Sequence, residues 1–308
     1  MKGAKLIVLV LVAVLICVGG WFMLRPRAVT GPALAEMLPA DTLLSIELIN
    51  LDQTIEEFKT SRLGEKMKEV DINSVLQAFN APAEQIENIN KLKDSILSTV
   101  DSVVFKELFG GDAVIALLPF DIRSEEEFEK VLSSIVLVSR TKHRAAVVEF
   151  ISMVISKHLE TQTHQLHDYE ITSLKTEGGF TVYYGIVDDL MIATFDLDTM
   201  IACLELRKAN EASLANTRYY QDLSGRLFTG DSTIFCFNNT QKLYENLVET
   251  ITAFSNEEDE KVNEVLEGFK NMEGFDAIAY SSYHDGGDLI RDRALLVFDK
   301  SRMSPVYA

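Results

Sequence analysis

Cysteine and basic residues are both scarce in this sequence. Three Cys in 308 residues exclude a fold built on a disulfide framework, and they exclude a zinc ribbon as well. Lys and Arg number 29 against 47 Asp and Glu, which gives a formal net charge of −18. The first 30 residues hold four of the basic residues and none of the acidic ones, so the remaining body carries −22. Such a body repels phosphate backbones, and we therefore expect no nucleic-acid partner.

The short motifs that mark common catalytic and cofactor sites are absent too. The chain has no G-x-x-x-x-G-K-[ST] loop for phosphates and no G-x-G-x-x-G turn for a dinucleotide. It has no H-E-x-x-H pair of zinc ligands and no G-x-S-x-G nucleophile elbow. We therefore predict no catalytic, cofactor-binding or metal-binding residues, and no cofactor.

An uncharged apolar run occupies residues 6–24. Its 19 residues would form a helix of about 28 Å, close to the hydrocarbon thickness of a bilayer. The run exceeds the apolar core of a signal peptide, and Arg25-Pro26-Arg27 stands where cleavage would occur. We predict an uncleaved transmembrane anchor at residues 1–27. Basic groups are slightly more numerous before the run than after it, which places the body outside the cytoplasm.

The rest of the chain has the composition of a packed globular protein, with 47% hydrophobic and 25% charged residues in the whole sequence. We divide it into a juxtamembrane linker at 28–40, a first half at 41–210 and a second half at 211–308. The boundary falls in the polar stretch 210–226, where the strand signals pause.

Apolar periodicity predicts both strands and helices in this body. Alternating residues, or short apolar runs between turn residues, predict strands at 42–49, 112–118, 135–138, 169–174, 180–187, 190–195, 231–237, 275–283 and 289–298. Apolar spacings of three and four residues predict helices after Asp52, across most of 62–108, at 124–132 and 147–155, after Asp198, from Thr240 and at 257–270. The strand at 42–49 is expected to be half-buried, with Ser45 and Glu47 on its polar side. The fold class is α+β, with mixed, largely antiparallel sheets packed against helices.

The two predicted halves begin alike. Each opens on an Asp and a hydroxyl residue, runs through a strand that an Asn closes, at Asn50 and Asn238, and continues into an apolar helix face. We predict a structural duplication in which the strands at 42–49 and 231–237 occupy equivalent positions in two related halves. The alternative is that strand–turn–helix units often look alike.

Three features together give the chain a resemblance to a known family. They are the N-terminal anchor, the Leu-Pro-Ala-Asp-Thr stretch at 38–42 before the first strand, and Ser-Leu-Ala at 213–215 followed by Tyr219-Tyr220. In these the chain resembles a bacterial family of membrane-anchored envelope proteins that is catalogued only as a domain of unknown function. The resemblance covers most of residues 36–299. It implies a bacterial envelope protein with a repeated α+β body, and it implies no activity and no catalytic residues.

A histidine cluster is the nearest approach to a metal site. Three His residues lie close together in the sequence beside two acidic residues: His158, His164, His167, Glu160 and Asp168. Three imidazoles and a carboxylate would suit Zn²⁺ or Ni²⁺. Their spacing matches no standard ligand frame, so we favour a polar connection between a helix and a strand, with the His residues at the surface.

Two further groups of residues admit a chemical role and a structural one. Asp188-Asp189 would offer paired carboxylates, and His-Asp-Gly-Gly-Asp at 284–288 a His with two Asp, but we favour turn residues at both places. Cys203 falls in a predicted helix and Cys236 in a predicted strand, where a free Cys behaves as a small hydrophobe. Whether these two Cys residues pair stays open.

These absences favour a non-catalytic role over an enzyme. We predict a single-pass protein of the cell inner membrane with a periplasmic body, which binds or scaffolds another protein of the bacterial envelope. The alternative is a carrier of a hydrophobic or small-molecule ligand, and an enzyme without a recognisable motif comes third. A closed apolar cavity would favour the carrier, and a cleft converging three titratable groups the enzyme. An exposed apolar patch on a rigid face would favour the protein binder, for which we expect docking at sheet edges, at 62–108 or at the hairpin 275–298.

Overall fold

A computed structural model describes the body of the chain in segments. These are residues 34–60, 65–66, 86–87, 89–90, 106, 110–123, 130–141, 160–166, 168–175, 180–209, 213–228, 232–254, 274–284 and 290–302. The predicted anchor at 1–27, the predicted helices at 147–155 and 257–270, and nearly all of 62–108 lie outside them. Within the described segments, no helix is long and apolar enough to span a bilayer.

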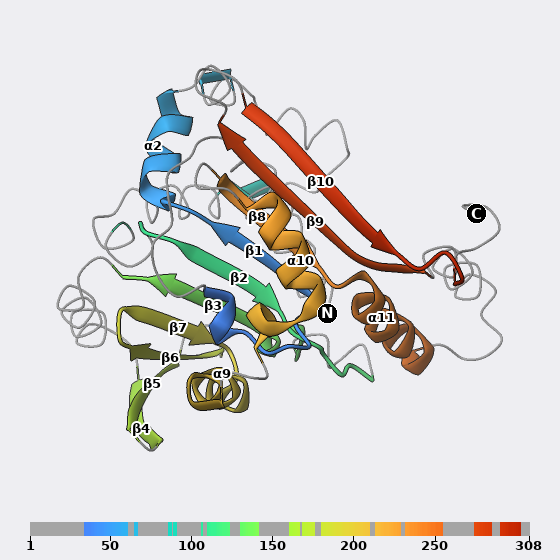
Figure 1. The fold of residues 1–308 in the computed structure, drawn as a ribbon. Helices are drawn as coiled ribbons and strands as arrows, with labels where there is room; N and C mark the ends of the chain where they lie inside the picture. Colours follow the sequence, from blue (N-terminus) through green and yellow to red (C-terminus); the bar gives the residue numbers. More distant parts are fainter. Residues whose placement is uncertain are drawn as a thin grey trace.

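One ten-stranded sheet forms the frame of the molecule (Figure 1), and every strand pairing in it is antiparallel. The strand order is β10-β9-β8-β1-β2-β3-β7-β6-β5-β4. The strands are β1 (Leu44–Leu48), β2 (Ala113–Leu117), β3 (Ile135–Arg140), β4 (Glu160–Leu166), β5 (Tyr169–Lys175), β6 (Thr181–Val187), β7 (Leu190–Thr194), β8 (Ser232–Asn238), β9 (Phe275–His284) and β10 (Ile290–Phe298). The fold is therefore α+β, with a large antiparallel sheet and helices.

Among the strands that the structure describes, β4 is the one that the apolar pattern failed to predict. Its sequence, ETQTHQL, has no apolar alternation, and it was expected to be a polar connection. It forms because it adds to the sheet edge beside β5, with His164 opposite Ile171 in the register. Backbone pairing with an existing strand supplies the order that its own side chains do not specify.

One face of the sheet carries the main core. Two helices and two short 3-10 turns cover this face: α9 (Leu197–Ala209), α10 (Arg218–Leu227), η1 (Leu34–Met37) and η3 (Leu214–Asn216). Helix α10 lies in front of the central strands in Figure 1 and buries Tyr220, Leu223 and Leu227. The ring of Tyr220 meets Phe235 and Phe237 of β8 edge to face, with centroids 5.7 and 5.4 Å apart.

The opposite face holds a smaller apolar cluster, so that every residue of β1 except the half-buried Leu44 is buried. Ile46, Leu48 and Ile234 pack there against the first turns of α2 (Leu51–Thr60). The expectation that β1 is half-buried is wrong, because Ser45 and Glu47 are buried on the α10 side. A period-two pattern predicts one polar face, but α10 comes from far along the chain and covers that face as well.

Strands β1 and β8 lie side by side in the sheet, and each leads directly into a helix. Leu44 of β1 pairs with Asn238 of β8 in an antiparallel register. Helix α2 follows β1, and α11 (Thr240–Phe254) follows β8. In α2 the first helical hydrogen bond runs from the N–H of Thr54 to the carbonyl of Asn50, at 3.0 Å. In α11 the corresponding bond runs from the N–H of Leu243 to the carbonyl of Asn239, at 2.9 Å. The N-cap of α2 is thus Asn50, and the prediction of Asp52 was wrong by two residues.

The N-cap of helix α9 likewise lies two residues before the predicted Asp198. The carboxylate of Asp196 accepts the backbone N–H of Thr199 at 2.8 Å, and its carbonyl accepts that of Met200 at 3.1 Å. Asp196, and not Asp198, is therefore the N-cap residue. The sequence offers both Asp residues, and only the path of the chain out of β7 selects between them.

Candidate functional site

Strand β10 borders the sheet and carries the exposed apolar surface of the described residues (Figure 1). Leu296 is 49% exposed and Phe298 is 46% exposed, and both are large apolar side chains. The two lie two residues apart in a strand, so they project from the same face. Leu295 and Val297 point the other way and pack against the main core. The strand therefore has one side anchored and one side presented to solvent.

The two borders of the sheet differ in character. At the far border, β4 carries Thr, Gln and His side chains that are exposed or half-buried. At the near border, β10 runs Ala-Leu-Leu-Val-Phe over residues 294–298 after a charged Arg-Asp-Arg start. Charged and polar side chains discourage the addition of another strand, whereas an apolar edge favours it. Of these two borders of the described sheet, β10 presents the more apolar edge.

The charged start of β10 is held in place by aromatic residues of β9. The guanidinium of Arg293 lies 4.9 Å from the ring centroid of Tyr283, within the range of a cation–π contact. The hydroxyl of Tyr280 donates a hydrogen bond of 2.7 Å to Asp292. Burial raises the pKa of the Tyr280 hydroxyl, and the hydrogen bond to the Asp292 carboxylate raises it further. Both interactions tie β10 to its neighbour and keep the outer edge extended.

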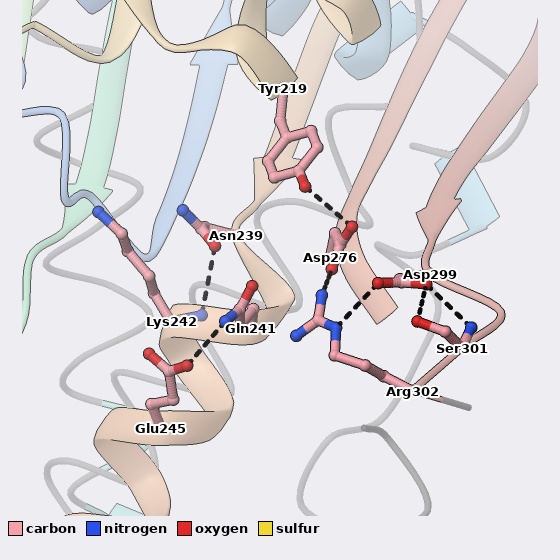
Figure 2. Close-up of polar contacts among 9 residues, drawn as sticks. All are labelled: Tyr219, Asn239, Gln241, Lys242, Glu245, Asp276, Asp299, Ser301 and Arg302. Atoms are coloured by element: carbon pink, nitrogen blue, oxygen red, sulfur yellow. Dashed lines mark hydrogen bonds and ion pairs between the residues drawn. The ribbon is translucent and has the colours of Figure 1, made fainter. Parts of the chain in front are cut away.

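A polar cluster fixes the other end of β10, as Figure 2 shows. Asp276 of β9 is buried. Its carboxylate accepts a hydrogen bond of 2.9 Å from the hydroxyl of Tyr219 of α10 and forms an ion pair with Arg302. Arg302 reaches back to Asp299 at 3.3 Å, and Ser301 donates to the same carboxylate from its N–H and its hydroxyl. The carboxylate of Asp276 raises the pKa of the Tyr219 hydroxyl. This cluster joins α10, β9 and the residues after β10.

A second polar pair is buried at the centre of the sheet. The hydroxyl of Tyr220 donates a hydrogen bond to the Glu47 carboxyl of β1. Burial raises the pKa of Glu47 from its ordinary 4.5 to about 7, the bond from Tyr220 acts in the opposite direction, and the charge of Asp112 adds to the rise. Burial and the carboxyl of Glu47 likewise raise the pKa of Tyr220. The pair is enclosed by apolar neighbours, so a substrate has no access to it.

An open hollow of about 500 Å³ lies between the segment after β2 and helix α11. Its lining residues are Pro119, Phe120, Asp121, Ile122, Arg123, Asn246, Glu249, Thr250 and Ala253. Asn246 uses its amide to hold the backbone of Phe120, accepting at 3.4 Å and donating at 2.8 Å. Asp121 and Arg123 pair with each other at 2.8 Å and face solvent, and Arg123 lowers the pKa of Asp121. This surface hollow has neither a closed apolar interior nor a converging set of free polar groups.

The predicted histidine cluster is only partly visible. His164 lies in β4 with its Nε2 3.4 Å from the hydroxyl of Ser173, while His158 and His167 lie outside the described residues. Asp168 occupies the turn from β4 to β5, and the backbone of Glu160 begins β4. In the described part of the chain, no three His, Cys, Asp or Glu side chains converge as metal ligands.

The predicted turn residues fall at strand ends. Asp188 joins β6 to β7 with a left-handed backbone, at φ 56°, which suits Asp better than most residues. The carboxylate of Asp189 forms an ion pair with Arg140 of β3, and the Arg140 Nε lies 3.8 Å from Asp112. The backbone of His284 ends β9, and residues 285–288 lie outside the described segments.

The two cysteines of the body lie on opposite faces of the sheet. Cys203 belongs to α9 and is buried in the main core, whereas Cys236 of β8 packs against the α2 cluster. Both are free thiols, and burial raises the pKa of each to about 12. The sheet lies between the two thiols, so no disulfide joins them in this fold.

Sequence reasoning missed the polar contacts that organise the site. Glu47 and Tyr220 are 173 residues apart, and Asp276 and Arg302 are 26 apart. Neither separation leaves a spacing signal in the sequence. The sequence does show a polar residue, Glu47, within an alternating strand, but the alternation pattern predicted that its side chain faces solvent.

Comparisons with known proteins bring no independent guide to function. No family model, no curated protein and no solved structure matches this chain. The resemblance to a family of envelope proteins therefore stays a prediction. The function has to be argued from the geometry of the described residues.

Proposed function

We propose that this protein is a non-catalytic, protein-binding component of the bacterial envelope and that it docks its partner on the outer edge of β10. The observation that carries the proposal is the exposure of Leu296 and Phe298 on a border strand of the sheet. Exposed apolar side chains beside an unpaired strand edge favour the addition of a strand from another protein. Among the described strands, β10 pairs with β9 alone.

The membrane assignment rests on the sequence. The apolar run at 6–24 anchors the chain in the inner membrane, and the body lies in the periplasm. A tether raises the effective concentration of the body near other membrane proteins without new contacts. The body charge of −22 opposes adhesion to anionic lipid head groups, which leaves proteins as the favoured partners.

We further infer that the body consists of two related units, and this relation bears on the β10 edge. Going out from the junction of β1 with β8, strands β1, β2 and β3 lie in that order on one side, and β8, β9 and β10 lie in that order on the other. Helices α2 and α11 follow the first strand of each unit. Strands β3 and β10 are then equivalent, and β3 pairs on its outer side with the antiparallel β7. The equivalent side of β10 is the side that we propose for the partner.

Neither of the other functional classes has comparable support. A carrier needs an enclosed apolar cavity, and the hollow beside α11 is open with mixed lining. An enzyme needs titratable groups that reach a substrate, and Asp121 and Arg123 in that hollow are exposed and paired with each other. The carboxyl of Glu47, whose pKa burial raises to about 7, is buried in the core.

Photo-crosslinking in cells tests the docking surface. A benzophenone amino acid at Leu296 or Phe298 of the full chain should give protein adducts under ultraviolet light. The same probe at Gln165, exposed on the opposite border, is the matched control and should give none. Probes on β10 that react only with lipid or with nothing, in a chain that retains a bound small molecule on purification, would refute the proposal and favour the carrier.

A further inference from the structure

We propose that helix α10 is a pH-dependent latch on the sheet, which the proton of the Glu47 carboxyl holds closed and which opens when that proton is lost. The moving part is α10, and the latch does not depend on the docking proposed at β10. Opening brings water to Glu47 and exposes the rings of Phe235 and Phe237, which Tyr220 covers in the closed state.

Helix α10 lies across three neighbouring strands, β9, β8 and β1 (Figure 1). On one side of β8, the hydroxyl of Tyr219 donates to the carboxylate of Asp276 in β9, at 2.9 Å. On the other side, the hydroxyl of Tyr220 donates to the carboxyl of Glu47 in β1. Two adjacent tyrosines therefore connect the helix to a buried carboxyl on each side of β8.

The two carboxyls differ in how their negative charge is balanced. The carboxylate of Asp276 forms an ion pair with the guanidinium of Arg302 (Figure 2). The hydrogen bond to Glu47 comes from a hydroxyl, which carries no charge, and the charge that acts on Glu47 is that of another acid, Asp112. A buried anion without an opposite charge is costly, so the closed latch favours the neutral acid at Glu47.

The groups around Glu47 include one arginine, and that arginine is bound by two other acids. The titratable and charged groups that act on Glu47 or on its neighbours in the described structure are Tyr220 of α10, Cys236 of β8, Asp112 before β2, Asp189 after β6 and Arg140 of β3. Arg140 lies 3.8 Å from Asp112 and pairs with Asp189. Loss of the Glu47 proton therefore leaves an unbalanced anion beneath α10.

Helix α10 is bounded by two positions that can serve as hinges. Thr217 before it and Phe228 after it have extended backbones, and no side chain caps its first turn. The chain on each side keeps attachments of its own. The N–H of Leu214 donates to the carbonyl of Leu38 at 2.7 Å, and the ring of Phe228 packs edge to face against Phe235, with centroids 5.5 Å apart. The helix can thus leave the sheet between two fixed ends.

Proton linkage gives the direction of the pH dependence. In the open state the carboxyl of Glu47 meets water and titrates near the ordinary 4.5, whereas in the closed state burial raises its pKa to about 7. Between these values the open state releases the proton and the closed state retains it. The equilibrium constant for opening therefore rises by up to about tenfold per pH unit in this range and is constant above pH 7, as far as Glu47 determines it.

Hydrogen–deuterium exchange of the detergent-solubilised full chain at pH 5 and pH 8 tests the latch. After correction for the pH dependence of intrinsic amide exchange, the protection of residues 218–227 should fall by about tenfold or more between the two pH values. At pH 8 these amides should also be less protected than those of β6 and β7 by about tenfold or more, because local opening leaves β6 and β7 in place.

Two variants and a matched control identify the group that titrates. Glu47→Gln keeps an acceptor for Tyr220 and carries no proton to lose, so the pH dependence of α10 protection should disappear. Tyr220→Phe removes the bond that lowers the pKa of Glu47, so protection should continue to fall at pH values where the wild type has become constant. The control Asp276→Asn changes the other tyrosine contact of α10 and should preserve the ratio between pH 5 and pH 8.

Three results would overturn the latch. The first is equal protection of α10 and of β6 and β7 at pH 8, which would mean that α10 opens only when the whole fold unfolds. The second is a pH dependence that survives in Glu47→Gln or is lost in Asp276→Asn. The third is a Tyr220→Phe chain whose protection becomes constant at the same pH as in the wild type. None of these results bears on crosslinking from Leu296, so the latch and the docking at β10 are tested separately.

Discussion

Replacing Glu47 by Gln should stabilise the protein above neutral pH and leave it unchanged in acid. In the folded chain, burial raises the pKa of Glu47 to about 7, whereas the unfolded chain titrates near the ordinary 4.5. Between these two values the unfolded state releases its proton and the folded state retains it. The free energy of unfolding therefore falls as the pH rises from 4.5 to 7 and is constant above 7, as far as this group determines it.

The size of the effect follows from the difference between the two pKa values. A shift of 2.5 units, from 4.5 to about 7, corresponds to about 3 kcal/mol at 1.36 kcal/mol per unit. Gln carries no charge at any of these pH values, and its amide oxygen still accepts the hydrogen bond from Tyr220. Glu47→Gln should thus raise the stability by about 2–3 kcal/mol at pH 8 and change it little at pH 4.

Denaturant unfolding of the full chain at pH 4, 6 and 8 measures this dependence. The matched control is Glu205→Gln, the replacement of an exposed acid on α9, which should change the unfolding free energy by less than about 0.5 kcal/mol. A Glu47→Gln protein that is less stable than the wild type at pH 8, or whose advantage is the same at pH 4, would refute the reasoning. The first result would mean that Glu47 is stabilised as an anion in the fold.

Four further predictions concern two tyrosines, the cysteines and the membrane orientation. Tyr220→Phe keeps the ring contacts but leaves Glu47 without its donor, and should lower the unfolding free energy by about 1–3 kcal/mol in a denaturant titration. Tyr219→Phe removes one of the two partners of a buried carboxylate and should cost about 1–2 kcal/mol, measured in the same way. Cys203 and Cys236 should both remain free under oxidising conditions. A mass loss of about 2 Da, the two hydrogens that a disulfide removes, would contradict their placement on opposite faces of the sheet. A periplasm-specific reporter fused after Ala308 should be active, and a fusion active only in the cytoplasm would reverse the predicted orientation.

The apolar pattern was sufficient to predict most elements of the sheet. The strands at 112–118, 135–138, 231–237 and the hairpin 275–298 were located from local residues, and β2, β3, β8, β9 and β10 occur there. Local signals succeed because the alternation of side chains and the residues in a turn act within a few positions of each other. They failed for β4, whose polar residues take their order from β5.

The sequence by itself determined where the chain extends and where it coils, and it located the apolar run that we interpret as an anchor. Tertiary structure alone decided which strands are neighbours, because side-chain alternation identifies a buried face but names no partner. It set β8 beside β1 and left β10 at a border. It also carried α10 over β1, which buried Glu47 against Tyr220. Burial, the pKa of Glu47 and the exposed apolar edge are all consequences of contacts between residues far apart in the chain, and no local pattern records them.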